Sequence, residues 1–244
     1  MYACPCEIQE CVFCEAQLYT GLSKDHVLQI RGILDKRRYQ PQEFLFHETD
    51  PSTHLFALRT GYVKLTSSLA DGRQQIIRLS VPGQLLGLGT VNGDAYPYTA
   101  RALTSVTVCR LTRKDMLRVL AENPPVSLRV IDHLNGELEQ AQAMIRDLGL
   151  KSANEKVASF IVSLIPARGP TPEKLVMPLS RQEIAEMLGL TVETVSRVMA
   201  QFKREDLIQT PRGHIHIKDQ ARLWKLAGVS RRLEIGDRPA AGAS

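Results

Sequence analysis

Hydrophobic positions along the chain follow two different periods, which divide it into a strand-rich first half and a helical second half. In the first half, apolar and polar residues alternate, the spacing of half-buried β-strands. The alternating segments are residues 44–48, 55–69, 73–81 and 106–112. Turn residues separate them at Pro51, Gly61, Asp71-Gly72, Pro82-Gly83, Gly87 and Gly93. Many short strands with tight turns predict a small antiparallel barrel or roll, preceded by a short helix at residues 22–36.

A long helix with a narrow apolar seam is predicted to follow the strands. Pro124 and Pro125 interrupt the strand pattern, and apolar residues then recur at spacings of 3, 4, 3, 4 and 3. This is the spacing of an a/d heptad seam. Its members are Ile131, Leu134, Leu138, Ala141, Ile145 and Leu148. So narrow a seam favours pairing with a second copy of the chain, and the alternative is a helix that packs on its own barrel.

Two further helical patterns are separated by a glycine. In the first, Ser180 and Glu183 have capping-box spacing, and Gly189 can end the helix. The second occupies residues 191–204 with Thr191 as its N-cap. Its apolar stripe consists of Val192, Val195, Met199 and Phe202. Helix, turn and helix predict a helix-turn-helix, whose second helix enters the DNA major groove, and the alternative is an ordinary helical hairpin in a core.

A different face of the second helix carries polar residues that project together. Glu193, Ser196 and Arg197 fall at i, i+3 and i+4. Upstream, residues 152–164 form another amphipathic helix. Downstream, the segments LIQT and HIHIKD flank the turn PRG at residues 207–219 and predict the two strands of a wing. The module is therefore of the winged-helix type.

The composition is that of an ordinary globular protein with a mildly basic character. The 244 residues are 43% apolar, with a formal charge of +5 and a pI of about 9.0. This charge fits nucleic-acid binding, but many other proteins share it. We expect a cytoplasmic protein without a membrane partner, because the chain has neither a long apolar run nor a signal-peptide layout. No catalytic constellation is present, so we expect no enzyme.

The cysteines are unevenly placed. Four of the five lie within eleven residues at the N-terminus, at Cys4, Cys6, Cys11 and Cys14. The fifth, Cys109, lies in the alternating segment at residues 106–112. Clustered thiols in a reducing compartment suggest a soft-metal site, and three arm thiols plus Cys109 would also suit a [4Fe–4S] cluster. The alternative is a disordered arm and a small buried Cys109.

The order of cysteine arm, roll, heptad helix and winged helix-turn-helix resembles the CRP/FNR family of bacterial transcription regulators. The most specific stretches are GQLLGL in the roll and LSRQEIAEMLGLTVETVSRVMAQFKREDLI in the C-terminal module. The resemblance covers nearly the whole chain and implies an α+β fold with a cyclic-nucleotide-binding-like antiparallel β-roll. The implied parts are a cysteine-rich arm at 1–21, the roll at 22–123, a dimerisation helix at 124–150, a winged helix-turn-helix at 151–230 and a disordered tail at 231–244.

Within the family the chain is most similar to the oxygen-responsive FNR branch, which has a cysteine arm and one more cysteine in the roll. Cys109 in VTVCRL stands where that last ligand stands. The arm departs from the usual C-x2-C followed by a longer gap, because it reads C-x-C-x4-C-x2-C. We expect a [4Fe–4S] cluster on Cys6, Cys11, Cys14 and Cys109, with Cys4, which precedes a proline, as an alternative ligand. Direct thiol redox, zinc, or a small-molecule effector in the roll are the alternatives.

The resemblance also argues against control by a cyclic nucleotide. Cyclic-AMP receptors of the family hold the phosphate and ribose with a Gly-Glu and an Arg-Ser pair. The matching stretches here read LLGLG and AYPYTAR, without the glutamate and without an Arg-Ser pair. A buried cyclic phosphate would have no charge partner at that point. We therefore expect no cyclic nucleotide in the roll.

In the recognition helix, Glu193, Ser196 and Arg197 match the E-x-x-S-R pattern of FNR-type readers, and Val192 replaces the arginine typical of cyclic-AMP receptors. Arginine can donate two hydrogen bonds to guanine, glutamate can accept from cytosine, and serine can do either. The resemblance implies half-sites like TTGAT in double-stranded DNA, arranged as an inverted repeat and read by a homodimer.

Three other residues complete the expected DNA surface. Arg181 matches a family phosphate contact, which would position the module without reading the sequence. Thr191 and Thr194, at the start of the recognition helix, are also expected at the DNA. RNA polymerase is the expected partner of an activator of this kind, through roll loops that the sequence does not identify.

Overall fold

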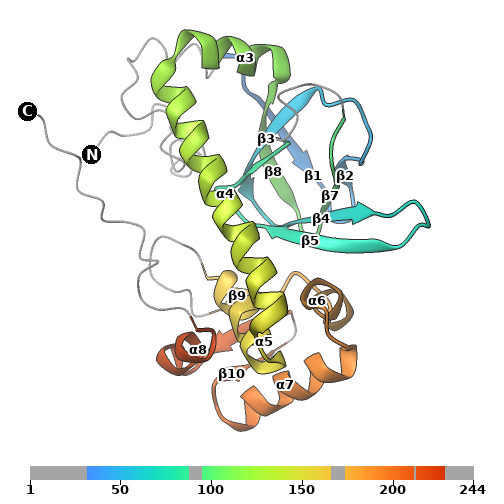
Figure 1. Ribbon diagram of the computed structural model, residues 1–244, viewed down its shortest axis with the longest axis vertical. Coiled ribbons are helices and arrows are strands. Elements are labelled where there is room, and N and C mark those ends of the chain that lie inside the picture. Colours follow the sequence, from blue (N-terminus) through green and yellow to red (C-terminus); the bar gives the residue numbers. More distant parts are fainter. Residues whose placement is uncertain (1–31, 88–94, 166–173, 212, 229–244) are drawn as a thin grey trace, which may run out of the picture. The chain divides into compact units, whose positions relative to one another are not determined.

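The computed structural model in Figure 1 describes residues 32–87, 95–165, 174–211 and 213–228. The chain divides into two compact units, the first ending at Gln142 and the second beginning at Ala143. The predicted arm and the predicted tail lie outside the described residues. None of the helices in these ranges is long and apolar enough to cross a membrane.

The described part of the first unit contains eight strands in two antiparallel sheets (Figure 1). They are β1 (Asp35–Tyr39), β2 (Phe44–Phe46), β3 (His54–Thr60), β4 (Val63–Ser68), β5 (Gln74–Ser80), β6 (Leu85–Leu86), β7 (Thr99–Ala102) and β8 (Val106–Thr112). One sheet has the order β1-β8-β3-β6 and the other β2-β7-β4-β5. This arrangement confirms the antiparallel roll, and each alternating segment of the sequence contains one or two of these strands.

In the sheet β1-β8-β3-β6, the central strands β3 and β8 are buried on both faces, whereas the edge strand β1 is largely exposed. On its inner face, Phe56 and Val108 belong to the apolar cluster that the two sheets share. On its outer face, Ala57 and Cys109 belong to a second cluster, with α3 (Arg113–Glu122) and α4 (Pro124–Leu150). Because successive strand residues point to opposite faces, β3 and β8 contribute to both clusters. The outer cluster also contains Leu55, Leu85, Leu111, Met116, Val119, Val126 and Val130.

Parts of the first unit differ from the sequence prediction. The helix expected at residues 22–36 is wrong at its C-terminal end: Gly32 is still helical, but Asp35 and Lys36 lie in β1. Pairing with β8 decides this, and Asp35 Oδ2 accepts a hydrogen bond from Arg110 Nε at 2.7 Å. The sequence analysis also missed α3, whose N-cap Thr112 accepts from the backbone N–H of Asp115 at 3.1 Å. The short strands β6 and β7 were not anticipated either.

The described part of the second unit is a helical module with a small sheet. Its elements are α5 (Ala153–Ser163), β9 (Leu175–Val176), α6 (Arg181–Leu188), α7 (Val192–Arg204), β10 (Ile208–Gln209), β11 (His214–Ile217) and α8 (Gln220–Leu226). The sheet has the order β10-β11-β9, and β10 and β11 confirm the two predicted wing strands. The sequence analysis did not anticipate β9 or α8. Asp219 caps α8 by accepting from the backbone N–H of Arg222 at 2.9 Å.

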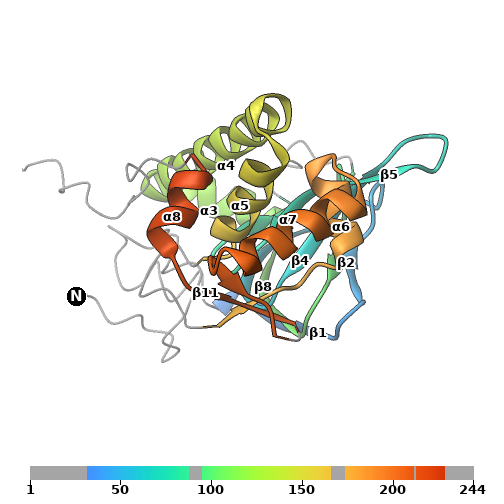
Figure 2. The ribbon, with the colours of Figure 1, turned by 90° about the horizontal axis from the view of Figure 1, so that it is seen from below.

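The local chemistry of α6 and α7 agrees with the prediction. The Ser180 hydroxyl accepts from the Glu183 N–H at 3.2 Å, and the Glu183 carboxylate accepts from the Ser180 N–H at 2.9 Å. This capping box begins α6. Gly189 ends it with a φ of 60°, a left-handed conformation that glycine adopts without strain. Thr191 then caps α7 by accepting from the Thr194 N–H at 3.2 Å. Figure 2 shows α6 and α7 side by side.

The apolar stripe predicted for α7 is wrong at one position. Val192 is 38% exposed, whereas Val198 is buried together with Val195 and Met199. Val192 is the first residue of the helix, one turn before the segment that packs in the core of the module. The buried face is therefore centred on residues 195–202.

Two glycines of the roll allow a test of its tight turns. Gly61 joins β3 to β4 with a φ of 85°, and a Cβ there would lie 2.4 Å from the Ser105 carbonyl oxygen. Gly72, between β4 and β5, has nearly the same φ of 86° but nothing within 4 Å of a Cβ. Gly72→Ala is expected to lower the free energy of unfolding by about 1 kcal/mol through left-handed strain. Gly61→Ala is expected to cost about 3 kcal/mol, because the backbone at Ser105 must also move.

Urea unfolding followed by circular dichroism measures both values. Each variant serves as the control for the other, because they share the strain and differ only in the space around the new methyl group. Equal losses in the two variants would contradict the close packing at Gly61.

Candidate functional site

The N-terminal half of α7 presents a polar face to solvent. Glu193, Ser196 and Arg197 are all exposed, whereas Val195 and Met199 point into the core of the module. The structure thus brings the three predicted base-reading residues together on one exposed surface. Such a helix can insert its first turns into a groove without uncovering its own core.

The first turn of α7 contains groups that can accept hydrogen bonds from a ligand. The backbone N–H of Glu193, followed by the Thr191 side chain, holds the pKa of the Glu193 carboxyl below its usual range, so this group is an acceptor at neutral pH. The Thr191 and Thr194 hydroxyls are 3.1 Å apart. Both threonines therefore act first as the cap of α7, and any contact they make with DNA is additional to this role.

Arg181 lies at the first position of α6. Its side chain is half-buried, and burial lowers the pKa of the guanidinium. Nη1 is buried and has no hydrogen-bond partner within the described structure. A buried donor without an acceptor is costly. An anionic oxygen at this point would satisfy it, which is the chemistry expected of a phosphate contact.

The heptad seam of α4 is exposed along its whole length. All six predicted members are exposed, with Leu138 at 56% and Ile145 at 71%. A different face of the same helix, with Val126 and Val130, is buried against the outer face of the roll. The helix therefore does pack on its own roll, as the alternative prediction proposed, but it does so with residues outside the seam.

The roll also holds α4 by an ion pair that the sequence analysis missed. Arg78 of β5 and Glu137 of α4 are 2.9 Å apart, and both side chains are largely buried. Burial raises the pKa of Glu137, but the nearby His133, whose Nε2 lies 3.4 Å from Oε1, and the charge of Arg78 outweigh this and leave the pKa below its usual range. The Glu137 carboxyl is thus ionised at neutral pH. The two partners are far apart in the sequence, so no local pattern reveals the pair.

Cys109 is buried in the outer cluster of the roll, in contact with the same group of residues as α4. Its side chain shares that cluster with Val126 and Val130. Ile33 and Leu34 pack against the cluster, and Lys36 of β1 is paired directly with Cys109. The other four cysteines lie outside the described residues. Within the described ranges, no group of three or more His, Cys, Asp or Glu residues is placed to hold a metal ion.

The inner face of the roll is filled with aromatic rings. Phe46 stacks on Tyr96 with ring centroids 3.9 Å apart, and Phe56 and Tyr98 lie close to Phe46. Arg101, the arginine of AYPYTAR, donates to the Gln42 carbonyl at 3.3 Å and lies 5.3 Å from the Phe44 ring centroid. This arginine is therefore already engaged with protein groups.

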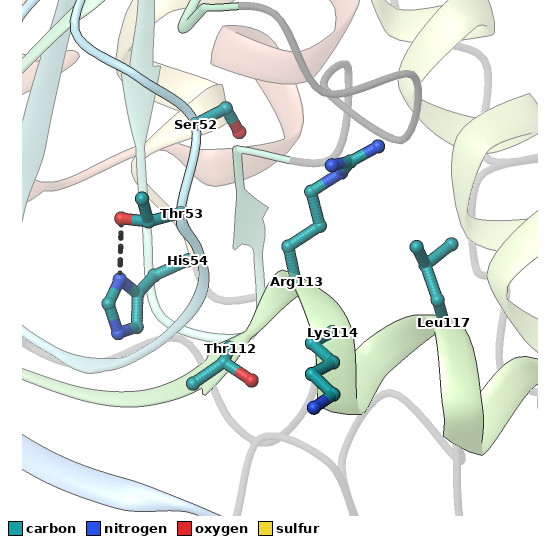
Figure 3. Close-up of a pocket in the computed structure, with 7 residues that line it drawn as sticks. All are labelled: Ser52, Thr53, His54, Thr112, Arg113, Lys114 and Leu117. Carbon is teal, nitrogen blue, oxygen red and sulfur yellow. Dashed lines mark hydrogen bonds between the residues drawn. The ribbon is translucent and has the colours of Figure 1, made fainter.

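A hollow on the surface of the roll lies beside the start of α3 (Figure 3). Within it, the Thr53 hydroxyl and His54 Nδ1 are hydrogen-bonded at 2.8 Å. The hollow contains none of the predicted DNA, seam or cysteine residues, so it is separate from the sites considered above. Its lining residues are Ser52, Thr53, His54, Thr112, Arg113, Lys114 and Leu117.

Comparisons with known proteins match both units. The family model described as the cyclic nucleotide-binding domain matches residues 36–123, and that described as the Crp-like helix-turn-helix domain matches residues 155–226. The transcriptional activatory protein AadR of Rhodopseudomonas palustris is 38% identical over 196 residues, covering 79% of this chain and 81% of that protein. The fumarate and nitrate reduction regulatory protein of Escherichia coli is 27% identical over 234 residues, covering 94% of both.

A solved structure gives the same result. FixK2 from Bradyrhizobium japonicum has a TM-score of 0.72 and 28% sequence identity, covering 80% of this chain and 97% of that chain. One relative is named as a transcriptional activatory protein and the other as a regulatory protein, and the similarity extends over the roll and the helix-turn-helix. The chain belongs to the CRP/FNR family of transcriptional regulators and is a DNA-binding regulator of its FNR branch.

Proposed function

We propose that the protein is a homodimeric transcriptional activator that binds TTGAT-type inverted repeats and responds to oxygen or redox state through a cysteine-ligated [4Fe–4S] cluster. The observation that carries the proposal is the pair of exposed surfaces on α7 and α4. One presents the three polar residues Glu193, Ser196 and Arg197. The other is an exposed apolar seam long enough for a coiled-coil contact.

The base-reading roles follow from hydrogen-bond chemistry. Arg197 is the residue that can donate two hydrogen bonds to guanine O6 and N7, and the ionised Glu193 can accept from cytosine N4. Ser196 can donate or accept. Arg181 would bind a phosphate through its buried, unpartnered Nη1 and fix the register of the module.

A homodimer accounts for both the seam and the inverted repeat. A two-fold dimer places two identical recognition helices against two half-sites about one turn of DNA apart. Pairing would bury the large apolar side chains of the seam, among them Leu138 and Ile145. Isolated apolar residues are normal on a surface, but a continuous stripe of them indicates an interface.

The residues around Cys109 fit a thiolate-ligated cluster. Cys109 is buried among apolar side chains, and the chain that leaves the arm packs beside it at Ile33 and Leu34. Cys6, Cys11 and Cys14, with Cys4 as the alternative, would supply the remaining thiolates, which are the ligands that iron–sulfur clusters require. When bound, the cluster supplies a crosslink between the arm and β8 that oxygen can break.

The chain's own packing would carry the response from β8 to the seam. Cys109 shares an apolar cluster with Val126 and Val130, so a change in the position of β8 acts on the first turns of α4. The Arg78–Glu137 ion pair holds the next turns of the helix to the roll. The signal can bias seam pairing only by its differential affinity for the paired and unpaired states.

The roll is proposed to act without a cyclic nucleotide. Its inner face belongs to an apolar cluster that includes Phe46, Phe56 and Tyr96. Arg101 faces away from that cluster and is engaged by Gln42 and Phe44. Contacts with RNA polymerase would come from exposed roll loops. The alternatives are the same DNA-binding dimer with direct thiol redox or zinc at the cysteines, or with a small-molecule effector in the roll.

Replacing Arg197 tests the DNA contact. Arg197→Ala is expected to lower affinity for a TTGAT inverted repeat by about 10- to 100-fold, because a bidentate guanine contact contributes roughly 1–3 kcal/mol. Discrimination against a base change in the half-site should fall with it. Arg204→Ala is the matched control, since it removes the same charge from the opposite end of α7. Fluorescence anisotropy measures both, and equal losses in the two variants would argue against base reading by Arg197.

A charge in the seam tests the dimer. Ile145→Asp is expected to weaken dimerisation by roughly 100-fold or more, because pairing would bury two like charges without partners. Its melting temperature should change little, since Ile145 is 71% exposed in the single chain. Leu69→Asp, at a 59% exposed position after β4, is the control. Sedimentation equilibrium gives the association constants, and an unchanged dimer in Ile145→Asp would refute the seam.

Anaerobic purification tests the cluster. The wild-type protein is expected to contain iron and sulfide and to show a visible chromophore that air removes. Cys109→Ser should lack the chromophore and the effect of oxygen on DNA affinity. Ala57→Ser is the control, because Ala57 is paired with Cys109 across β3 and β8 and lies in the same buried cluster.

Three results would replace the cluster with an alternative. Zinc without sulfide would indicate a zinc site, and thiol oxidation without any metal would indicate direct redox sensing. Regulation that survives deletion of residues 1–16 would indicate an effector in the roll.

A further inference from the structure

Lys151 lies in the short connection between α4 and α5, and its ammonium group is almost fully enclosed. Its side chain is 16% exposed. Nζ donates to Asp147 Oδ2 at 2.5 Å, to Ser159 Oγ at 2.8 Å and to the Ala227 carbonyl oxygen at 2.8 Å. A lysine ammonium has three N–H donors, so these acceptors satisfy it completely.

The three acceptors belong to three different helices of the second unit. Asp147 lies in the last turn of α4, Ser159 in α5, and Ala227 is the C-cap residue of α8. The Ser159 hydroxyl also donates to the Glu155 carbonyl at 2.8 Å, which leaves its oxygen free to accept from Lys151. Carbonyls at a helix C-terminus lack intrahelical partners and attract a cation. One side chain thus ties α4 to both α5 and α8.

The helices that Lys151 joins are in turn packed against the recognition helix α7, through α5. Figure 2 shows α5 between α8 and the α6–α7 pair, and α5 packs on both α7 and α8. Val157 and Ile161 of α5 are fully buried. Asn154 Nδ2 of α5 lies 3.4 Å from Gln201 Oε1 of α7. Because packed helices move as rigid bodies, an orientation fixed at Lys151 is passed on to α7.

The last turn of α4 also lies near the turn between α6 and α7. A Cβ at Gly189, in the turn between α6 and α7, would lie 4.0 Å from Leu148 Cδ2. The last turn of α4 therefore approaches the helix-turn-helix on one side while Asp147 holds Lys151 on another. Only the second of these contacts is polar and directional.

We propose that Lys151 is a positioning residue for DNA binding, which fixes the last turn of α4 to the winged-helix unit. In the homodimer of the proposed function, on which this role rests, the paired seams then hold two α7 helices at the spacing of an inverted repeat. Lys151 touches no base in this role and acts through the orientation of α7. The two linked recognition helices gain affinity by binding two half-sites at once. This gain is lost when the geometry prevents both helices from binding together.

The test compares two DNA probes with the full-length protein prepared without oxygen. One duplex carries a TTGAT inverted repeat and the other a single half-site. Lys151→Met keeps the aliphatic stem and removes the three donors. It is expected to lower affinity for the inverted repeat by about tenfold or more, while half-site affinity changes by less than about twofold. The dimer association constant should be unchanged, because Lys151 is not a seam residue.

Lys225→Met is the matched control. Lys225 lies in the last turn of α8, is exposed, and is two residues from the carbonyl that Lys151 binds. Its replacement removes the same charge from the same unit without removing the three-way contact, so both probe affinities should stay close to those of the wild type. Lys151→Arg keeps the charge, but a planar guanidinium does not fit three acceptors around one nitrogen, so it should resemble Lys151→Met.

Milder variants provide the same test if Lys151→Met does not fold. Asp147→Asn and Ser159→Ala each weaken one of the three contacts, and they should lower inverted-repeat affinity selectively. In the double variant of Asp147→Asn and Lys151→Met the losses should be less than additive, because both remove one interaction.

Two results would overturn this role alone. One is a Lys151→Met protein that binds the inverted repeat as well as Lys225→Met does. The other is an equal loss on both probes, which would mean that Lys151 only supports the folding of the module. A wild-type protein without preference for the inverted repeat would refute the homodimeric function itself, and this role with it.

Discussion

The structure depends on the long helix α4, which has two separate apolar faces. One face of α4 is buried against the outer face of the sheet β1-β8-β3-β6 through Val126 and Val130, and the seam face with Leu138 and Ile145 is exposed. The first face is fixed by the chain's own core, and the second is the face that the proposed homodimer would bury. In the proposed homodimer, a change at the roll would reach the seam without altering either fold, because packed interfaces switch between discrete arrangements and do not deform smoothly.

The two faces of the sheet β1-β8-β3-β6 have different surroundings. Its inner face belongs to a core that contains the stacked rings of Phe46 and Tyr96. Its outer face contains Cys109 and α4. In the proposed regulator the signal therefore enters on the outer side, next to the helix that it controls. The cluster that Cys109 shares with Val126 and Val130 would connect such a ligand on β8 to α4.

In the winged-helix unit, local contacts set the ends of the recognition helix, and long-range packing sets its orientation. The capping box at Ser180 and Glu183, the left-handed Gly189 and the Thr191 cap set where α6 and α7 begin and end. These contacts are local, and each contributes about 1 kcal/mol. The orientation of α7 comes instead from its packed face and, in the role proposed for Lys151, from the contacts of this residue with α4, α5 and α8.

The sequence by itself determined the antiparallel roll, the wing strands and the polar face of α7, because period, turn residues and caps act over a few residues. It also predicted the seam, since six apolar positions follow one spacing. Tertiary structure decided that Asp35 and Lys36 form a strand, because their pairing with β8 overrides the helical pattern. It likewise decided that Val192 is exposed, and it produced the Arg78–Glu137 and Lys151 contacts. Arg78 and Glu137, like Lys151 and Ala227, lie far apart in the chain, so no local pattern encodes their contacts.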